Sequence, residues 1–287
     1  MTGKTCLVTG ANQGIGKETA IGLARLSATV VITARDRAKG ERALVDIKRR
    51  SASDAVELML VDFASLDSIR QFAGDFQRRH QRLHVLVNNA GAYNAARTLT
   101  QDGFEATFGV NHLGYFLTTK LLLDTIRASA PARIVNVSAG AHTGASINFD
   151  DLQGQRSYRG WGAYAQSKLA NILFTYELAR RLEGTGVTAN CLHPGVVVTG
   201  FGQNNTGVAG RLFSLFHAVG RPFLLTPEKG ARTSVYLASS PAVEAVTGKY
   251  FANGREQKSS AMSYDADIAR RLWEVSEALV ASPPPRS

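Results

Sequence analysis

Tyr164 and Lys168 stand four residues apart in a segment whose pattern predicts a helix. On a helix, this spacing places both side chains on one face, so an ammonium group can lie beside a phenol that must release or supply a proton. Such a pair can perform general acid and base chemistry on an alcohol or a carbonyl. Because a Tyr and a Lys at this spacing also occur in ordinary helices, the interpretation needs support from elsewhere in the chain.

A glycine turn near the amino terminus gives the first support. The apolar run 5–9 leads directly into Gly10-Ala11-Asn12-Gln13-Gly14-Ile15-Gly16, and a helical pattern follows from Lys17. Glycines permit positive φ angles and let backbone N–H groups approach a pyrophosphate at the positive end of a helix. The spacing G-x-x-x-G-x-G differs from the commoner dinucleotide fingerprint, so the strand, turn and helix context carries the expectation. The alternative is a tight turn that is merely rich in glycine.

Apolar runs of strand length alternate with helical patterns along the chain, at residues 29–34, 56–61, 85–88, 133–138, 188–192 and 248–251. This alternation predicts an α/β fold, namely a single-domain, doubly wound (Rossmann-type) parallel sheet of about seven strands with helices on both faces. We expect one domain over residues 1–281, with a substrate lid at about 200–226 and a Pro-rich tail at 282–287. Ligands of such sheets bind outside the carboxyl ends of the strands.

The end of the second predicted strand offers two kinds of cofactor contact. A carboxylate about 20 residues beyond the glycines, here Asp36, would hold a ribose 2′-hydroxyl, whereas an arginine, here Arg35, would hold a 2′-phosphate. Asp36 could instead cap the following helix. We favour Arg35 on a phosphate, because guanidinium matches phosphate geometry and further cations lie nearby at Lys17, Arg37 and Lys39.

Polar and small residues follow three other predicted strands. Asp62, with Phe63, follows the third strand, where the carboxylate could accept from an adenine amino group or cap a helix. The run Asn88-Asn89-Ala90-Gly91 follows the fourth strand, and Ser138 ends the fifth. Because the carboxyl ends of parallel strands meet at one edge, we expect these residues beside the glycine turn. The Ser138 hydroxyl there further supports the Tyr164–Lys168 pair.

Three more positions complete a pattern that spans nearly the whole chain, namely Asn111, the pair Pro194-Gly195, and Thr199. Together with the glycine turn, the run 88–91, Ser138 and the Tyr–Lys pair, they resemble the short-chain dehydrogenase/reductases. Longer stretches resemble the retinol-dehydrogenase-like branch of that family, at residues 108–114, 132–138, 167–171 and 193–197.

The resemblance implies a role for each matched position. Tyr164 would be the general acid toward a carbonyl or the base toward an alcohol, with Lys168 favouring the phenolate and holding the nicotinamide ribose. Ser138 would hydrogen-bond the substrate oxygen, and Asn111 would fix a water that leads protons toward Lys168. Thr199 would meet the carboxamide. The implied NADP(H)-binding residues are Gly10, Asn12, Gln13, Gly14, Ile15, Gly16, Arg35, Asp62, Phe63, Asn89, Ala90, Gly91, Tyr164, Lys168, Pro194, Gly195 and Thr199.

Apolar side chains crowd the predicted lid, at Phe201, Leu212, Phe213, Leu215, Phe216, Phe223, Leu224 and Leu225. A lid of this kind suits an apolar or aromatic carbonyl compound, because small-molecule pockets are lined mainly by such side chains. Ordinary packing of the lid on the body is an equal alternative, and a membrane-surface helix with Arg211 and Arg221 is a weaker one. The segment 147–152 and Trp161 are expected to overhang the same pocket.

Composition limits the other classes of function. The chain has 287 residues and a net charge of +10, with an excess of basic residues on the predicted helix from Arg37 to Arg50. We interpret that excess first as a solvated helix face and second as attraction for a polyphosphate ligand, because no nucleic-acid-binding motif is present. No apolar run approaches the roughly 18 residues of a membrane span. Cys6 and Cys191 fall in predicted buried strands, which indicates neither a disulfide nor a metal site.

The sequence therefore predicts an NADP(H)-dependent oxidoreductase that transfers a hydride between the nicotinamide and a carbonyl/alcohol pair. A small apolar or aromatic ketone, aldehyde or alcohol is the expected partner, and no nucleic acid or membrane span is expected. The alternative is a catalytically silent regulatory protein that binds NADPH. A cytoplasmic location is expected, and the sequence leaves assembly into a homo-oligomer open.

Overall fold

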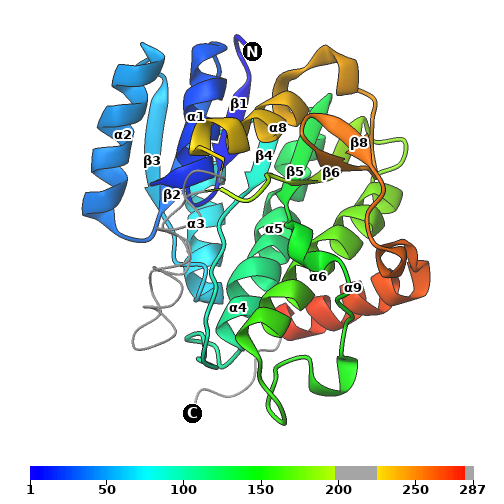
Figure 1. Ribbon diagram of the computed structural model, residues 1–287. Helices are drawn as coiled ribbons and strands as arrows, with labels where there is room; N and C mark the ends of the chain where they lie inside the picture. Colours follow the sequence, from blue (N-terminus) through cyan, green and yellow to red (C-terminus); the bar gives the residue numbers. More distant parts are fainter. Residues whose placement is uncertain (198–224, 282–287) are drawn as a thin grey trace.

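A single twisted sheet of eight strands lies at the centre of the protein (Figure 1). The computed structural model describes residues 1–197 and 225–281. The strands are β1 (Thr5–Val8), β2 (Thr29–Ala34), β3 (Val56–Leu60), β4 (Val85–Asn88), β5 (Ala132–Val137), β6 (Val187–His193), β7 (Tyr250–Ala252) and β8 (Arg255–Gln257). Their order is β3-β2-β1-β4-β5-β6-β7-β8, and all neighbours pair in parallel except β7 and β8. The strand order reverses between β1 and β4, which is where ligands of doubly wound sheets bind.

Helices cover both faces of the sheet, as the alternating pattern predicted. On one face, the buried core joins strand residues to α1 (Gly14–Arg25), α2 (Arg37–Ser51) and α8 (Pro227–Ser239). On the other face, the core involves α3 (Leu66–Arg79), α5 (Gly114–Arg127), α6 (Gly160–Arg181) and α9 (Ala266–Ala281). A short helix α4 (Ala106–Phe108) runs into a π-helical turn, η1 (Gly109–Leu113), directly before α5. None of the helices described here has both the length and the apolar character needed to cross a membrane.

The predicted strands are confirmed, with shifts of one or two residues at several ends and one strand missed. The last predicted run, 248–251, becomes β7 at Tyr250–Ala252, because Gly248 has a φ of +67° and belongs to the preceding turn. The missed strand is β8, which pairs antiparallel with β7 through a tight turn. Asn253 and Gly254 form that turn with φ angles of +53° and +72°. An Asn-Gly pair between short strands is a strong hairpin signal, so the sequence held the information.

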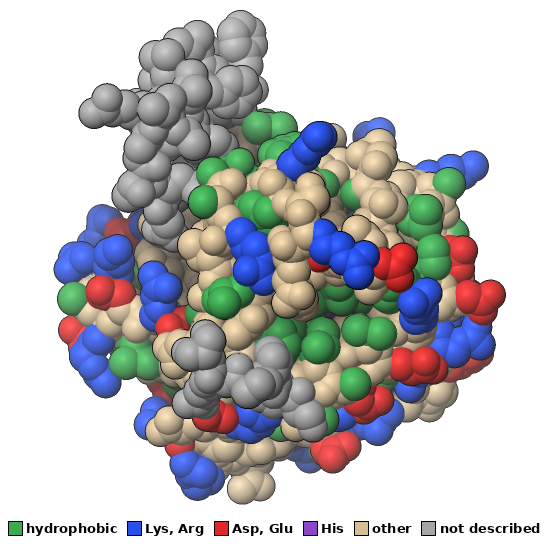
Figure 2. Space-filling view, turned by 90° about the horizontal axis from the view of Figure 1, so that it is seen from below, with side chains coloured by type: hydrophobic (Ala, Val, Ile, Leu, Met, Phe, Trp, Pro, Cys, Tyr) green, Lys and Arg blue, Asp and Glu red, His purple; other side chains and the backbone are tan. Residues whose placement is uncertain are grey.

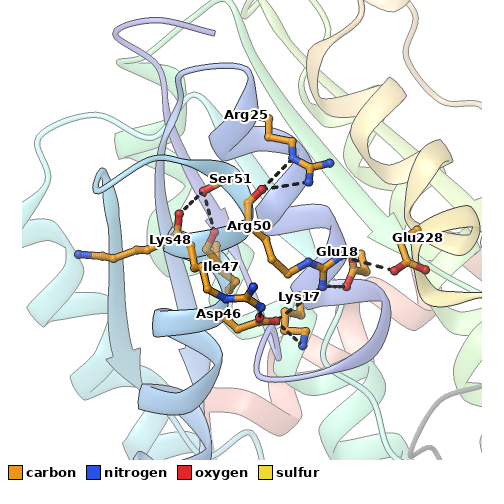
Figure 3. A network of polar contacts seen from close by, with 10 residues as sticks. Lys17, Glu18, Arg25, Asp46, Ile47, Lys48, Arg50, Ser51 and Glu228 are labelled. Atoms are coloured by element: carbon orange, nitrogen blue, oxygen red, sulfur yellow. Dashed lines mark hydrogen bonds and ion pairs between the residues drawn. The ribbon is translucent and has the colours of Figure 1, made fainter.

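Ion pairs fasten the basic helix α2 to its neighbours (Figure 3). Arg50 donates to both carboxylate oxygens of Glu18 on α1, at 2.6 and 2.7 Å, and lies 3.5 Å from Glu228 on α8. Lys17 of α1 donates to Asp46 of α2 at 2.9 Å, and this hydrogen bond is the main reason why the pKa of Asp46 falls to about 2. Glu18 therefore offsets the charge of Arg50, and Asp46 of α2 offsets the charge of Lys17 on α1.

Charges of both signs are also interspersed on the surface, as Figure 2 shows for the face seen from below. The two cysteines, Cys6 in β1 and Cys191 in β6, are buried thiols, as their strand positions predicted. Burial raises the pKa of both thiols. They fill the core next to apolar neighbours and take no part in the site described below.

Candidate active site

The glycine turn between β1 and α1 adopts the backbone that its sequence predicted. Gly10 and Gly14 have φ angles of +63° and +58°, in the left-handed region that favours glycine. A Cβ at Gly10 would lie 2.8 Å from the Ala90 Cα, and a Cβ at Gly16 would lie 2.4 Å from Asn89 Nδ2. Any side chain would therefore push the turn away from the loop after β4.

The start of α1 suits a phosphate group. Gln13 occupies the N-cap without a side-chain cap hydrogen bond, and the first turn of this described helix has no acidic residue. Its backbone N–H groups can therefore serve a bound anion. Asn12 and Gln13 also line a pocket of about 200 Å³ with basic residues of α1 and α2, namely Lys17, Lys39 and Arg42. The residues present thus fit a dinucleotide.

Two threonines that the sequence analysis did not single out as binding residues hold this turn in place. Thr9 Oγ1 accepts from the backbone N–H groups of Asn89 and Ala90, at 2.8 and 3.0 Å. Thr33 Oγ1 accepts from the Gly10 N–H at 3.1 Å. Asn89 Nδ2 closes the arrangement by donating to the Thr9 carbonyl at 2.8 Å. Their positions at the carboxyl ends of β1 and β2 were the signal that could have identified them.

The structure separates the two roles considered for the residues after β2. Asp36 is the N-cap of α2, and its carboxylate accepts from the Lys39 N–H at 2.8 Å. The capping alternative is thus confirmed for Asp36. Arg35 is exposed on the same loop, directly before Asp36.

Asp62 and Phe63 follow β3, but Asp62 does not cap α3. The N-cap is Ser65, whose hydroxyl accepts from the Ser68 N–H at 3.3 Å. Asp62 Oδ1 instead accepts from the Ala64 N–H at 3.0 Å, which shapes the loop at the carboxyl edge of the sheet. The helix-cap alternative for Asp62 is therefore wrong. Phe63 is buried near Gly114 of α5.

Lys168 lies at the centre of the predicted catalytic group. Its side chain is only 4% exposed, and Nζ donates to the Val137 carbonyl at 3.1 Å. The same nitrogen lies 5.7 Å from the centre of the Tyr164 ring, from which it is separated by one helical turn of α6. A Cβ at Gly91 would lie 3.6 Å from Nζ, so the loop after β4 passes close to the ammonium group.

Ser138 meets the same helix from the end of β5. Its Oγ donates to the Lys168 carbonyl at 2.7 Å, and its own N–H donates to Leu192 of β6 at 2.7 Å. Ser138 is 2% exposed. To donate to a substrate oxygen, the O–H must rotate away from the Lys168 carbonyl, which a hydroxyl rotor allows. Ser138, which directly follows β5, is thus brought together with Lys168 of α6, one helical turn from Tyr164.

Asn111 lies in the π-helical turn η1, a type of irregularity that is frequent at functional sites. Its side chain accepts from the Ala92 N–H at 2.7 Å, donates to the Ala92 carbonyl at 3.0 Å, and donates to Ser167 Oγ at 3.0 Å. The residue therefore joins the loop after β4 to α6, directly beside Lys168. Both N–H bonds of its amide are used in this way, whereas Oδ1, which can accept two hydrogen bonds, accepts the one from Ala92.

Burial dominates the protonation of the Tyr–Lys pair. It lowers the pKa of Lys168 to about 7 and raises the pKa of Tyr164 well above its usual value. Both changes disfavour the charged forms, as expected for groups removed from water. A positive charge beside the Tyr164 hydroxyl would act in the opposite direction and favour the phenolate.

The segment between Ser138 and Tyr164 lines a second pocket. The pocket has a volume of about 470 Å³, and its lining includes Asn148, Leu152, Tyr158 and Trp161. Trp161 is 60% exposed, and its ring centre lies 5.7 Å from that of Tyr164. Part of the predicted overhanging segment, together with Trp161, thus lines this pocket, and Trp161 also contacts the Tyr164 ring.

Pro194 and Gly195 follow β6, and Gly195 has a φ of +88°. Val197 pairs with Leu225 in an isolated bridge, and the Leu225 N–H donates to Val196 at 2.8 Å. Of the predicted lid, only Leu225 and Thr226 are described. Thr199, the rest of the lid and the Pro-rich tail lie outside the described residues.

The fold and this group of residues together define a nicotinamide-dependent oxidoreductase of the α/β class. The family profile described as short chain dehydrogenase matches residues 4–207. The chain is 47% identical over 293 residues to human retinol dehydrogenase 14, covering 98% of this chain and 87% of that one. It belongs to the short-chain dehydrogenase/reductase family and is similar to its retinol dehydrogenases.

Solved structures agree with this assignment. A crystal structure of a protein from Mycobacterium paratuberculosis aligns with a TM-score of 0.78 at 35% identity, over 99% of this chain and 96% of that one. The Pseudomonas aeruginosa RhlG/NADP active-site complex aligns with a TM-score of 0.68 at 25% identity, over 94% and 97%. The protein is an enzyme that transfers hydride with a nicotinamide cofactor.

Proposed function

We propose that this enzyme interconverts an apolar or aromatic ketone or aldehyde with its alcohol and uses NADP(H) in preference to NAD(H). The observation that carries the proposal is that Ser138 bonds to the Lys168 carbonyl while Lys168 Nζ lies 5.7 Å from the centre of the Tyr164 ring, next to the loop after β4. When bound, the nicotinamide supplies or accepts the hydride and, in its oxidised form, carries positive charge.

The side chains of this protein then have separate tasks. Tyr164 gives a proton to the carbonyl oxygen or removes one from the alcohol, and Ser138 holds that oxygen by a hydrogen bond. Lys168, held by Val137, stabilises the phenolate and holds the ribose. Asn111 keeps the loop after β4 against α6, which keeps Lys168 in place. Burial of the group excludes water from the reacting atoms.

Charge at the end of β2 supports the preference for NADP(H). The Asp36 carboxylate, which would otherwise hold a ribose 2′-hydroxyl, is used as the cap of α2. Exposed Arg35 and the basic pocket beside the glycine turn supply the positive charge that a 2′-phosphate needs. The RhlG structure in complex with NADP is a relative in which this phosphorylated cofactor is accommodated.

Replacement of Arg35 tests the cofactor preference. We expect Arg35→Ala to weaken NADPH binding by about tenfold or more while NADH binding changes by less than about twofold, because a charge-assisted hydrogen bond is worth roughly 1.5–3 kcal/mol. Titration of both reduced cofactors by fluorescence gives the two dissociation constants. Arg25→Ala, which removes an exposed arginine bound to the Arg50 carbonyl, is the control. Equal losses for NADPH and NADH would remove Arg35 from phosphate recognition.

A turnover assay tests the reaction itself. The purified protein is supplied with NADPH and a panel of aromatic ketones, aliphatic aldehydes and all-trans-retinal, and cofactor oxidation is followed by absorbance. The retinoid is included because the similar relatives are named retinol dehydrogenases. Faster turnover of apolar than of hydrophilic carbonyl compounds is the expected result. Tight NADPH binding with no turnover of any of them would favour a regulatory protein instead.

A further inference from the structure

His193 accepts two backbone hydrogen bonds at one ring nitrogen. It is the last residue of β6, and its Nδ1 lies 3.2 Å from the Gly140 nitrogen and 3.2 Å from the Gly195 nitrogen. Both partners are N–H donors, so Nδ1 acts as the acceptor and the neutral ring carries its proton on Nε2. Burial lowers the pKa of His193, which favours the neutral form.

The two donors belong to the loop after β5, which carries Ser138, and to the loop after β6. Gly140 is two residues beyond Ser138, and Gly195 directly follows Pro194 in the loop after β6. The strands that carry these loops are neighbours, with Val137 opposite Leu192. A Cβ at Gly140 would lie 3.5 Å from His193 Cε1, so the imidazole also packs on the backbone of the Gly140 turn.

The neighbouring imidazole is fixed in a complementary manner. His142 Nε2 accepts from the Ser260 N–H at 3.2 Å, and Nδ1, 2.7 Å from the Ala139 carbonyl, therefore carries the proton. The Tyr250 ring lies 5.1 Å from His142 and adds a neutral aromatic neighbour. The neutral His142 ring thus bonds to the Ala139 carbonyl and connects the turn at 139–140 to Ser260.

We propose that His193 is a positioning residue of the reaction: its Nδ1 ties the Ser138–Gly140 turn to the Pro194–Gly195 turn. The first turn carries the hydroxyl proposed to hold the substrate oxygen, and the second is proposed to hold the nicotinamide. The imidazole thereby fixes the relative position of the two reactants. This inference rests on the proposed roles of Ser138 and Pro194-Gly195.

Three substitutions at one position separate this role from simple packing. In His193→Asn, the amide oxygen is attached where Nδ1 was and can accept the same N–H groups. In His193→Gln, the amide is one carbon farther out, and in His193→Ala no acceptor remains. We expect His193→Ala to lower kcat by about tenfold or more, with NADPH affinity within about threefold of the wild type. We expect His193→Asn to restore kcat to within about threefold, and His193→Gln not to do so.

His84 provides the matched control. Its Nδ1 also accepts a backbone N–H, from Thr5 at 3.0 Å, but His84 precedes β4 at the amino ends of the strands. His84→Ala is therefore expected to lower thermal stability without lowering kcat by more than about twofold. A fall in kcat of equal size in His84→Ala and His193→Ala would overturn the proposal, because general loosening of the sheet would then explain both.

Amide hydrogen exchange gives a readout that does not depend on turnover. The Gly140 and Gly195 amides should be protected in the wild type and in His193→Asn, and should exchange at least about tenfold faster in His193→Ala. Unchanged protection of both amides in His193→Ala, or equal rescue of kcat by Gln and Asn, contradicts the proposal. If the wild type shows protected amides but turns over no carbonyl compound, the proposed function and a role of His193 in it are both refuted. If the wild type is active and His193→Ala is fully active, the inference about His193 alone is refuted.

Discussion

Tyr164→Phe is expected to reduce turnover by about 1000-fold, because general acid–base catalysis typically contributes factors of 10² to 10⁴. The substitution removes one hydroxyl and keeps the ring, which packs edge-on against Tyr93 and beside Trp161. Stability and NADPH affinity should therefore remain close to those of the wild type. Steady-state kinetics with the best carbonyl substrate of the panel, together with fluorescence titration of NADPH, measures both properties.

Tyr176→Phe is the matched control for this experiment. Tyr176 is another buried tyrosine of α6, three turns beyond Tyr164, and its hydroxyl bonds to Ser259 at 2.7 Å. Loss of that hydroxyl should leave kcat nearly unchanged, although it can lower the free energy of unfolding by about 1 kcal/mol. Turnover of Tyr164→Phe at the level of Tyr176→Phe would remove Tyr164 from proton transfer.

The sequence was most informative where local chemistry and strand order act together. Parallel strands bring their carboxyl ends to one edge, so the glycine turn, Asn89 and Ser138 could be placed together before their contacts were known. Lys168 was placed with them by its spacing from Tyr164 and by the family resemblance. Glycine permits the positive φ angles that Gly10 and Gly14 adopt, whereas Gly16 of the same motif lies within α1 and does not adopt one. The order of the elements therefore predicted the general arrangement of the site.

Individual hydrogen bonds were less predictable, because each polar side chain had several available partners. Asp36 and Asp62 both follow a strand, yet Asp36 caps a helix and Asp62 bonds within its own loop. The difference depends on the residue at which each helix begins, and sequence patterns locate that residue only to within a few positions. The two bonds of His193 depend on how closely two loops approach, and this distance is set by the packing of the whole sheet.

Lys168→Met is expected to abolish measurable turnover and, at the same time, to stabilise the protein without cofactor. In the wild type, burial lowers the pKa of Lys168 to about 7, so the folded state is destabilised whenever this amine is charged. Methionine has a similar length and carries no charge. We expect the free energy of unfolding to increase by about 2 kcal/mol near pH 6, after subtraction of the lost hydrogen bond to Val137.

The pH dependence distinguishes this explanation from a general improvement in packing. Because the folded pKa of Lys168 lies below its unfolded value of 10.5, the unfolded chain binds more protons between pH 7 and pH 10.5. Wild-type stability therefore gains from rising pH in this window, and the advantage of Lys168→Met should shrink as the pH approaches 10. Denaturant unfolding at several pH values measures this difference, with exposed Lys120→Met as the control. A constant advantage from pH 6 to pH 10 would show that the buried charge is not its cause, and a lower stability at pH 6 would show that Lys168 stabilises the fold.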